Sequence, residues 1–233
     1  MAGYNLKNKE EVKEYLKKLH IEYNFGCYSE KNPEVCHLLG DYNEAIFKNY
    51  KKSAELFKKN CDTFNFARSC NKYARYNTTG VGVDGKDLKT AYQYMKKGCE
   101  LGDGESCLYT GLMIMSSDDI GVEKSEVFQE GLDNMKKACH EMKEYRACSE
   151  LGKFYINGVE NLIKKDEKYA SKLFVIGCEK GDSSACFTLA QMYNRGIGVV
   201  KSEKMAHKFR RKASEIEQEK KKNVGLQFHQ GIN

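Results

Sequence analysis

The stretch CEKGDSSAC (residues 178–186) places two cysteines eight positions apart around a Gly-Asp turn. All ten cysteines of the chain form couples of this kind: Cys27 with Cys36, Cys61 with Cys70, Cys99 with Cys107, Cys139 with Cys148, and Cys178 with Cys186. The first cysteines of successive couples follow one another after 34, 38, 40 and 39 residues. A nearly constant period in this range is typical of a solenoid, in which each repeat packs only against its neighbours. The sequence therefore predicts about five repeats.

Each repeat has the pattern of two helices. Four positions after the second cysteine of every couple stands a small residue, on the same helical face: Gly40, Ala74, Gly111, Gly152 and Ala190. Glycine-bearing turns end these helices, most clearly at Gly80, Gly158 and Gly196. A second helix then leads to the first cysteine of the next couple. The predicted fold class is an all-α, right-handed α/α solenoid.

The same pattern predicts how the cysteines pair. In CEKGDSSAC, Gly181 is placed to end one helix, and Asp182 or Ser183 to cap the next. Cys178 then lies in a last turn and Cys186 in a first turn of antiparallel neighbours, where their side chains can meet. We expect five local disulfides, one in each couple. Each should stabilise the fold by about 2.5 kcal/mol on the chain-entropy model, since it closes a loop of about nine residues.

The repeats leave two end segments. Residues 1–26 are expected to form an N-terminal capping helix, with Val12, Leu16 and Leu19 at helical spacing. Residues 219–233 are expected to form a basic C-terminal tail. Residues 27–218 between them make the solenoid, with approximate units 33–66, 67–104, 105–145, 146–182 and 183–218.

Composition and cysteine usage together suggest a location. The chain is 40% hydrophobic and 31% charged with a single proline, which is typical of an ordered, helix-rich protein. We expect no membrane span, no signal peptide and no matrix-targeting presequence. Paired cysteines nevertheless require an oxidising compartment. The mitochondrial intermembrane space fits both observations, whereas reduced cysteines would indicate a cytosolic adaptor.

The stretch ACFTLAQMYNRGIGVVKSEKMAHKFRRKAS (185–214) resembles Sel1-like repeats, a TPR-like family that includes bacterial arrays with one disulfide per repeat. The stretch CYSEKNPEVCHLLGDY (27–42) and the chain length resemble the mitochondrial members of this family. That resemblance implies an intermembrane-space assembly factor or scaffold for respiratory-chain complexes, chiefly cytochrome c oxidase. The implied partners are respiratory-chain subunits or other assembly factors, and the oxidative import machinery of that compartment. A monomer is expected.

Enzymatic function is not expected, and no catalytic residue is assigned. Ser69 and Lys72 match the S-x-x-K of serine β-lactamases, but the S-D-N and K-T-G partners of that motif are missing from the sequence. The alternative is a thiol-disulfide reductase that exchanges one couple with a client. Second cysteines near helix starts and neighbouring lysines would favour a reactive thiolate.

No metal or cofactor is expected either, because the couples lack the C-x-x-C spacing of zinc sites and the five histidines do not cluster. Haem or copper contact remains an alternative, with His37, next to Cys36, as the candidate ligand.

Two surfaces could bind a partner. Lysine pairs stand in register before three of the first cysteines, and an arginine pair continues the series. They predict a stripe that would bind acidic proteins or anionic lipid head groups, or simply face solvent: Lys58, Lys59, Lys96, Lys97, Lys136, Lys137, Arg210 and Arg211. Nucleic acid is not an expected partner, since no binding motif accompanies the stripe. Tyrosines on the first helices, such as Tyr73, Tyr155 and Tyr193, either pack between helices or line a binding face.

Overall fold

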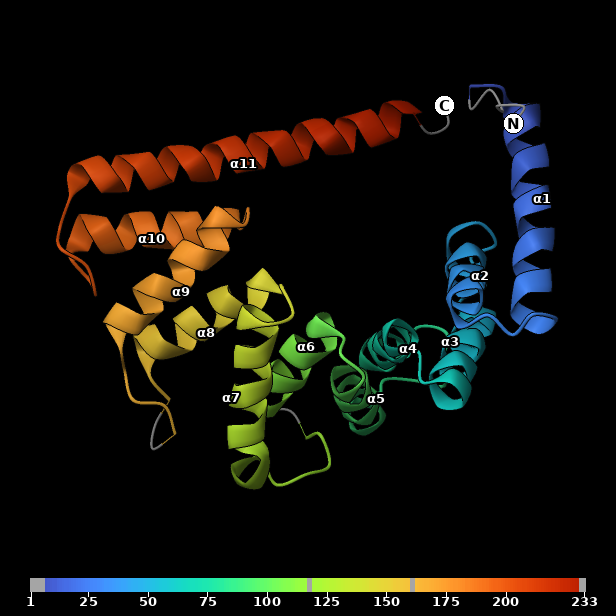
Figure 1. The fold of residues 1–233 in the computed structure, drawn as a ribbon, viewed down its shortest axis with the longest axis horizontal. Coiled ribbons are helices and arrows are strands. Elements are labelled where there is room, and N and C mark those ends of the chain that lie inside the picture. Colours follow the sequence, from blue (N-terminus) through green and yellow to red (C-terminus); the bar gives the residue numbers. More distant parts are fainter. Residues whose placement is uncertain (1–6, 117–118, 160–161, 231–233) are drawn as a thin grey trace. The chain divides into compact units, whose positions relative to one another are not determined.

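The structure is a computed structural model that describes residues 7–116, 119–159 and 162–230. Within these residues the chain forms eleven α-helices and no β-strand (Figure 1), so the all-α prediction is confirmed. The helices are α1 (Lys9–Tyr28), α2 (Pro33–Ala45), α3 (Tyr50–Phe64), α4 (Ala67–Thr79), α5 (Leu88–Glu100), α6 (Gly104–Met115), α7 (Lys124–His140), α8 (Tyr145–Asn157), α9 (Glu167–Glu179), α10 (Ser183–Arg195) and α11 (Glu203–Gln230).

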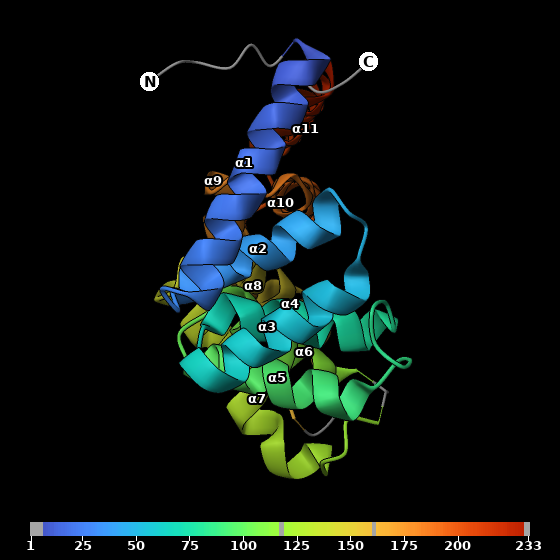
Figure 2. The same ribbon diagram turned by 90° about the vertical axis from the view of Figure 1, so that its right-hand side faces the viewer.

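These helices belong to two compact units, which meet in the sequence between Val127 and Phe128, inside α7. In the first unit α1 to α6 pack in chain order, each helix against the next (Figures 1 and 2). In the second unit α8 packs on α9 and α9 on α10, and Phe209 and Ala213 of α11 join the same core. Each unit therefore has the neighbour-to-neighbour packing of a solenoid.

Small residues let the helices of one repeat approach closely. A Cβ atom added to Gly40 would collide with the ring of Phe57, a fully buried residue of the following helix. A Cβ atom on Gly152 would lie 2.9 Å from carbons of the Phe174 ring. Both phenylalanines stand four positions before a first cysteine. In these two repeats the glycine of one helix and the aromatic ring of the next therefore form a close packing contact.

The five disulfides join the end of one helix to the start of the next. Their Cα atoms lie 4.4 to 4.9 Å apart, and the described residues contain no free cysteine. Local sequence sets up this geometry. Asp182 caps α10, because its carboxylate accepts hydrogen bonds from the backbone amides of Ser184 and Ala185. Gly181 adopts a φ of +92° in the turn before it, so the predicted turn and cap are confirmed.

Two G-x-G turns seat one repeat on the preceding one. Gly82 and Gly198 have φ angles of +72° and +65°, which favour glycine. A Cβ atom on Gly82 would lie 2.5 Å from the carbonyl oxygen of Tyr50, at the start of α3. A Cβ atom on Gly198 would collide with the carbonyl of Glu167, at the start of α9. The second glycine of the turn thus permits direct backbone contact between repeats.

The end segments are helical in the described part of the chain. The N-terminal segment forms α1, whose N-cap Asn8 accepts a hydrogen bond from the amide of Glu10. At the other end α11 continues to Gln230. Residues 1–6 of the predicted cap and 231–233 of the predicted tail lie outside the described residues. Among the described helices, none combines the length and apolarity needed to span a bilayer.

Candidate functional site

His37, the candidate haem or copper ligand, lies in the core between α2 and α4. Its side chain is flanked by the rings of Phe57 and Phe66, with ring centroids 5.3 and 5.5 Å away. Its Nδ1 lies 2.9 Å from Ser69 Oγ, and its Nε2 lies 3.6 Å from Asp41 Oδ2. Both ring nitrogens therefore face groups of the protein itself. Haem or copper contact at His37 stays a prediction.

Ser69 Oγ links His37 to a further buried side chain. It accepts a hydrogen bond from Asn60 Nδ2 and is also hydrogen-bonded to His37 Nδ1, and the tautomer of the imidazole sets the direction of that second bond. Burial lowers the pKa of His37, and the Asp41 carboxylate opposes this effect. The site therefore favours a neutral imidazole.

The S-x-x-K motif does not form a nucleophilic site. Ser69 is fully buried, so its hydroxyl is closed to substrates. Lys72, the lysine of the motif, points elsewhere: its Nζ lies 2.9 Å from Asp41 Oδ1 and 3.0 Å from Glu44 Oε2. The serine and the lysine thus serve separate structural contacts. This arrangement gives β-lactam chemistry no support.

A polar contact between successive repeats recurs next to the second cysteines. Asn71, which follows Cys70 as His37 follows Cys36, donates from Nδ2 to Ser106 Oγ at 3.1 Å. Ser149, at the same place after Cys148, hydrogen-bonds the carboxylate of Asp182. These side chains are buried or nearly so. The contact explains why polar residues stand in the core beside the disulfides.

In the first unit, two lysines of the predicted basic stripe form ion pairs with Asp62. Lys58 Nζ lies 2.7 Å from Asp62 Oδ2, and Lys97 Nζ lies 3.8 Å from Asp62 Oδ1. Tyr94 donates its hydroxyl to the same carboxylate at 3.0 Å. Hydrogen bonds to Asp62 and Tyr94 raise the pKa of Lys58. Lys59 is exposed, and Lys96 is half-buried.

In the second unit, Lys136 pairs with Asp133 at 3.1 Å and Arg211 with Glu215 at 3.3 Å. Lys137 and Arg210 are exposed. Acidic neighbours therefore offset much of the charge at the predicted positions, and binding by the stripe stays a prediction.

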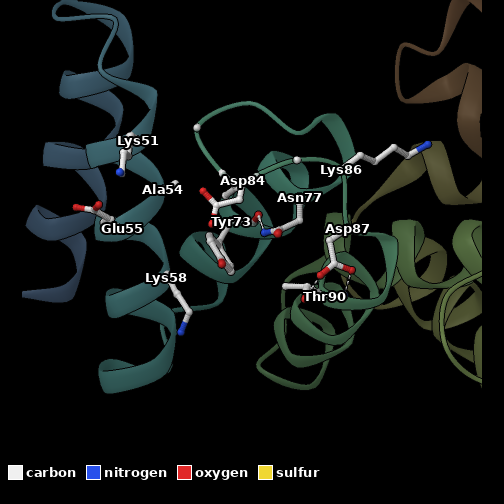
Figure 3. A pocket seen from close by; sticks show the side chains of 13 residues that line it. Lys51, Ala54, Glu55, Lys58, Tyr73, Asn77, Asp84, Lys86, Asp87 and Thr90 are labelled. Atoms are coloured by element: carbon white, nitrogen blue, oxygen red, sulfur yellow. Dashed lines mark hydrogen bonds between the residues drawn. The ribbon is translucent and has the colours of Figure 1, made fainter.

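A groove of about 460 Å³ runs between α3, α4 and the turn before α5 (Figure 3). Lys51 and Lys58 of α3 lie on one side, with Asp84 of the turn and Asp87 on the other. Asp87 caps α5, and a hydrogen bond from the hydroxyl of Thr90 holds the pKa of its carboxyl below the usual range. Charges of both signs thus line the groove, and Asp87 has a structural role as the N-cap of α5.

The tyrosines on the first helices pack within repeats. Their rings contact aromatic rings of the next helix at centroid distances of 4.6, 4.8 and 5.6 Å in the pairs Tyr73 with Tyr94, Tyr155 with Tyr169, and Tyr193 with Phe209. The packing interpretation therefore holds for these three tyrosines.

One surface was missed by the sequence analysis. The Cys27–Cys36 disulfide lines an open, largely apolar pocket of about 380 Å³ at the junction of α1, α2 and α3. Cys27 is 7% exposed, more than any other cysteine. Lys31 and Lys59, both exposed, also line the pocket. The pocket combines a disulfide in its wall, apolar side chains and positive charge.

The fold and these contacts can be compared with known proteins. The model of the Sel1 repeat family matches residues 33–62, 67–103, 146–182 and 183–215. The chain belongs to the Sel1 repeat family. Each matched segment contains one pair of helices, from α2 with α3 to α10 with α11. The matches pass over residues 104–145, where α6 and α7 complete the series of helix pairs.

Curated relatives align with this Sel1 repeat protein over nearly its whole length. It is 37% identical to the cytochrome c oxidase assembly factor 7 homolog of Drosophila melanogaster, over 99% of this chain and 98% of that protein. It is 34% identical to cytochrome c oxidase assembly factor 7 of Danio rerio, over 96% and 98% of the two chains. The human protein of that name is 30% identical, over 96% and 97%.

Solved structures share the fold. A Sel1 repeat protein from Oxalobacter formigenes superposes with a TM-score of 0.74 at 23% identity, over 91% of this chain and 83% of that one. A protective antigen of uropathogenic Escherichia coli reaches a TM-score of 0.72 at 17% identity, over 91% and 49%. The solenoid architecture of this Sel1 repeat protein is therefore shared with bacterial proteins.

Proposed function

We propose that this Sel1 repeat protein is an assembly factor for cytochrome c oxidase that acts as a scaffold through protein–protein contacts. The observation that carries the proposal is the end-to-end similarity to relatives named for that role, at 37% identity with the Drosophila protein. Because the alignment covers nearly all of both chains, the shared feature is the entire repeat array. Solenoids commonly act by presenting extended binding surfaces.

We further propose the mitochondrial intermembrane space as its location. Five disulfides support this, because such bridges form and persist in oxidising compartments and are rare in the cytosol. Respiratory-chain subunits or other assembly factors would be its partners, with oxidative import machinery forming the bridges. We expect the protein to be a monomer.

The test is complementation in cells that lack the protein. Full-length protein should restore assembled cytochrome c oxidase on native gels, together with oxidase activity. A variant lacking all cysteines, expressed at the same level, is the matched control and should fail. Oxidase that assembles normally without the protein would refute the proposal.

Location is tested separately by counting free thiols on the protein as isolated from its cells, by alkylation before and after reduction. Ten blocked thiols in local pairs are expected. Ten free thiols would instead indicate a reduced cytosolic adaptor.

A second candidate function, thiol-disulfide exchange, is favoured by the Cys27–Cys36 bridge. It combines the most exposed cysteine with a pocket carrying Lys31 and Lys59, whose charges would stabilise a thiolate. A client thiolate would attack one sulfur, form a mixed disulfide and release the other cysteine as a thiolate. A C27S/C36S variant that still restores oxidase assembly, at matched protein level, would rule out a required exchange at this bridge.

A further inference from the structure

Helix α1 exposes three large apolar side chains on one face. Ile21, Phe25 and Tyr28 are 61%, 59% and 50% exposed. Their spacing of four and then three residues places them on one side of the helix. They form an apolar strip along the last two turns of α1.

The repeat pattern does not require this strip. Counted from the first cysteine, the three residues occupy positions −6, −2 and +1. At these positions the second helices of the repeats carry polar or charged residues, Ile176 excepted: Glu55, Lys59 and Asp62; Gln93, Lys97 and Glu100; Asp133, Lys137 and His140; Lys172, Ile176 and Glu179. Alignment of the couples therefore shows that α1 replaces a hydrophilic face by an apolar one.

The core of the first unit does not use the strip either. Helix α1 packs on α2 through its other side, where Cys27 is buried and Tyr23 packs against the core. Tyr42 of α2 donates its hydroxyl to the carbonyl of Leu16. In Figure 2 α1 lies in front of α2 and α3, and no helix of this unit covers its outer side. A contiguous exposed apolar surface that packing does not need is typical of an interaction site.

The strip continues into the pocket beside the Cys27–Cys36 bridge. Tyr28 belongs to both, and Leu56 and Phe64 supply further apolar lining. Among the residues that the structure describes, Lys31 and Lys59 are the only charged ones that line the pocket. A concave apolar site with cations at its side fits a protruding apolar side chain that has carboxylates next to it.

We propose that this surface, the α1 strip with its pocket, docks an acidic amphipathic helix of a partner protein. Apolar residues of that helix, at the same helical spacing, would cover Ile21 and Phe25. One bulky side chain would enter the pocket beside Tyr28, and neighbouring carboxylates would meet Lys31 and Lys59. A concave pocket favours a side chain over a lipid surface. This inference rests on the proposed function in one respect, that a protein is what binds to the α1 strip and its pocket.

The experiment places a photoreactive benzoyl-phenylalanine at position 28 of the full-length protein, expressed in its own cells. The matched control carries it at position 140, the same register in α7. The expected result is one protein adduct, specific to position 28, whose cross-linked site lies in an acidic helical segment. A lipid adduct, a second copy of this chain, equal labelling at position 140, or no adduct would each overturn the proposal.

Two variants with the probe at position 28 test the chemistry. I21E/F25K installs the residues that α3 carries at this register, so thermal unfolding should be unchanged while the adduct falls at least about tenfold. K31E/K59E keeps the apolar strip and should also lose most of the adduct. An adduct that survives either variant contradicts the proposal. Cross-linking does not depend on oxidase assembly, so a failed complementation refutes the proposed function without deciding this inference.

Discussion

His37 Nδ1 lies 2.9 Å from Ser69 Oγ across the boundary between two repeats, in a position from which water is excluded. Replacing Ser69 alone leaves the buried Nδ1 of His37 without its partner, which is more costly than removing both side chains. In the third repeat the corresponding places, after Cys107 and before Cys148, hold Leu108 and Ala147. The sequence register thus holds two polar residues at His37 and Ser69, two apolar residues at Leu108 and Ala147, and one of each at Ser149 and Ala185, where Ser149 bonds Asp182 instead.

This pairing predicts non-additive mutants. S69A should lower the free energy of unfolding by about 1–3 kcal/mol, because His37 and Asn60 lose a buried partner. H37L/S69A, which transplants the Leu108–Ala147 pair, should cost less than the sum of H37L and S69A. Denaturant unfolding of the oxidised protein measures all three. Additive costs would show that the two side chains are not coupled.

The buried imidazole also predicts a pH dependence. Burial lowers the pKa of His37 in the folded protein below the value of about 6.5 that it has when unfolded. Between those two values the unfolded state binds more protons, so stability is fully present above about pH 6.5 and falls as the pH drops towards the folded pKa.

The control for this effect is H37N, which places a side-chain amide at this position, as Asn71 does in the next repeat, but does not titrate. The melting temperatures of the wild type and H37N, compared at about pH 7.5 and about pH 5.5, should diverge at the lower pH. Parallel losses in the two proteins would assign the acid sensitivity to other groups.

A comparison of alanine substitutions at Gly102 and Gly82 can distinguish the cost of a left-handed backbone from the cost of a steric clash. Gly102 has a φ of +93° and open space around it, so G102A should cost only about 1 kcal/mol. Gly82 has a similar φ of +72° but also abuts the carbonyl of Tyr50. G82A should therefore cost about 3 kcal/mol or more. Thermal unfolding compares them, and equal costs would mean that the turn does not seat on α3.

Exposure predicts the order in which the bridges are reduced. Cys27–Cys36 should react first with a mild reductant in the folded protein, since Cys27 is 7% exposed and lines an open pocket. Cys61–Cys70 and Cys178–Cys186 should react last, because all four cysteines are fully buried. Timed alkylation with mass readout measures the order. In denaturant the preference should vanish; if it persists there, accessibility is not its cause.

The features that the sequence predicted correctly are those set by the repeat period, namely the helix pairs and the turns. Constant spacing was enough for the helix pairs and turns, because each depends on residues within about one repeat, as at Asp182 and Gly181. The ion pairs of the basic stripe could not be predicted in the same way. The sequence gives the positions of the lysines, but the ion pairs of Lys58 and Lys97 with Asp62 depend on how neighbouring helices approach one another.

The α1 strip could have been found from the sequence. Alignment of the first cysteines places Ile21 and Phe25 against charged residues of the other helices. The couples define the repeats, and the residues between the couples distinguish α1 from the other helices. The exposure of Ile21 and Phe25 could not be predicted, because an apolar residue on a helix face can be buried by packing or exposed to solvent.

Four disulfides join the second helix of one repeat to the first helix of the next, and Cys27–Cys36 joins the capping helix α1 to the first repeat, so every bridge crosses a boundary. A solenoid without such bridges frays from its ends, one neighbour interface at a time. Here those interfaces are bonded covalently, and a terminal repeat cannot detach while its bridge is intact. Breathing motions must then open the other junction, between the two helices of a single repeat at its glycine turn. Oxidation thereby selects which hinge of the array remains free to move.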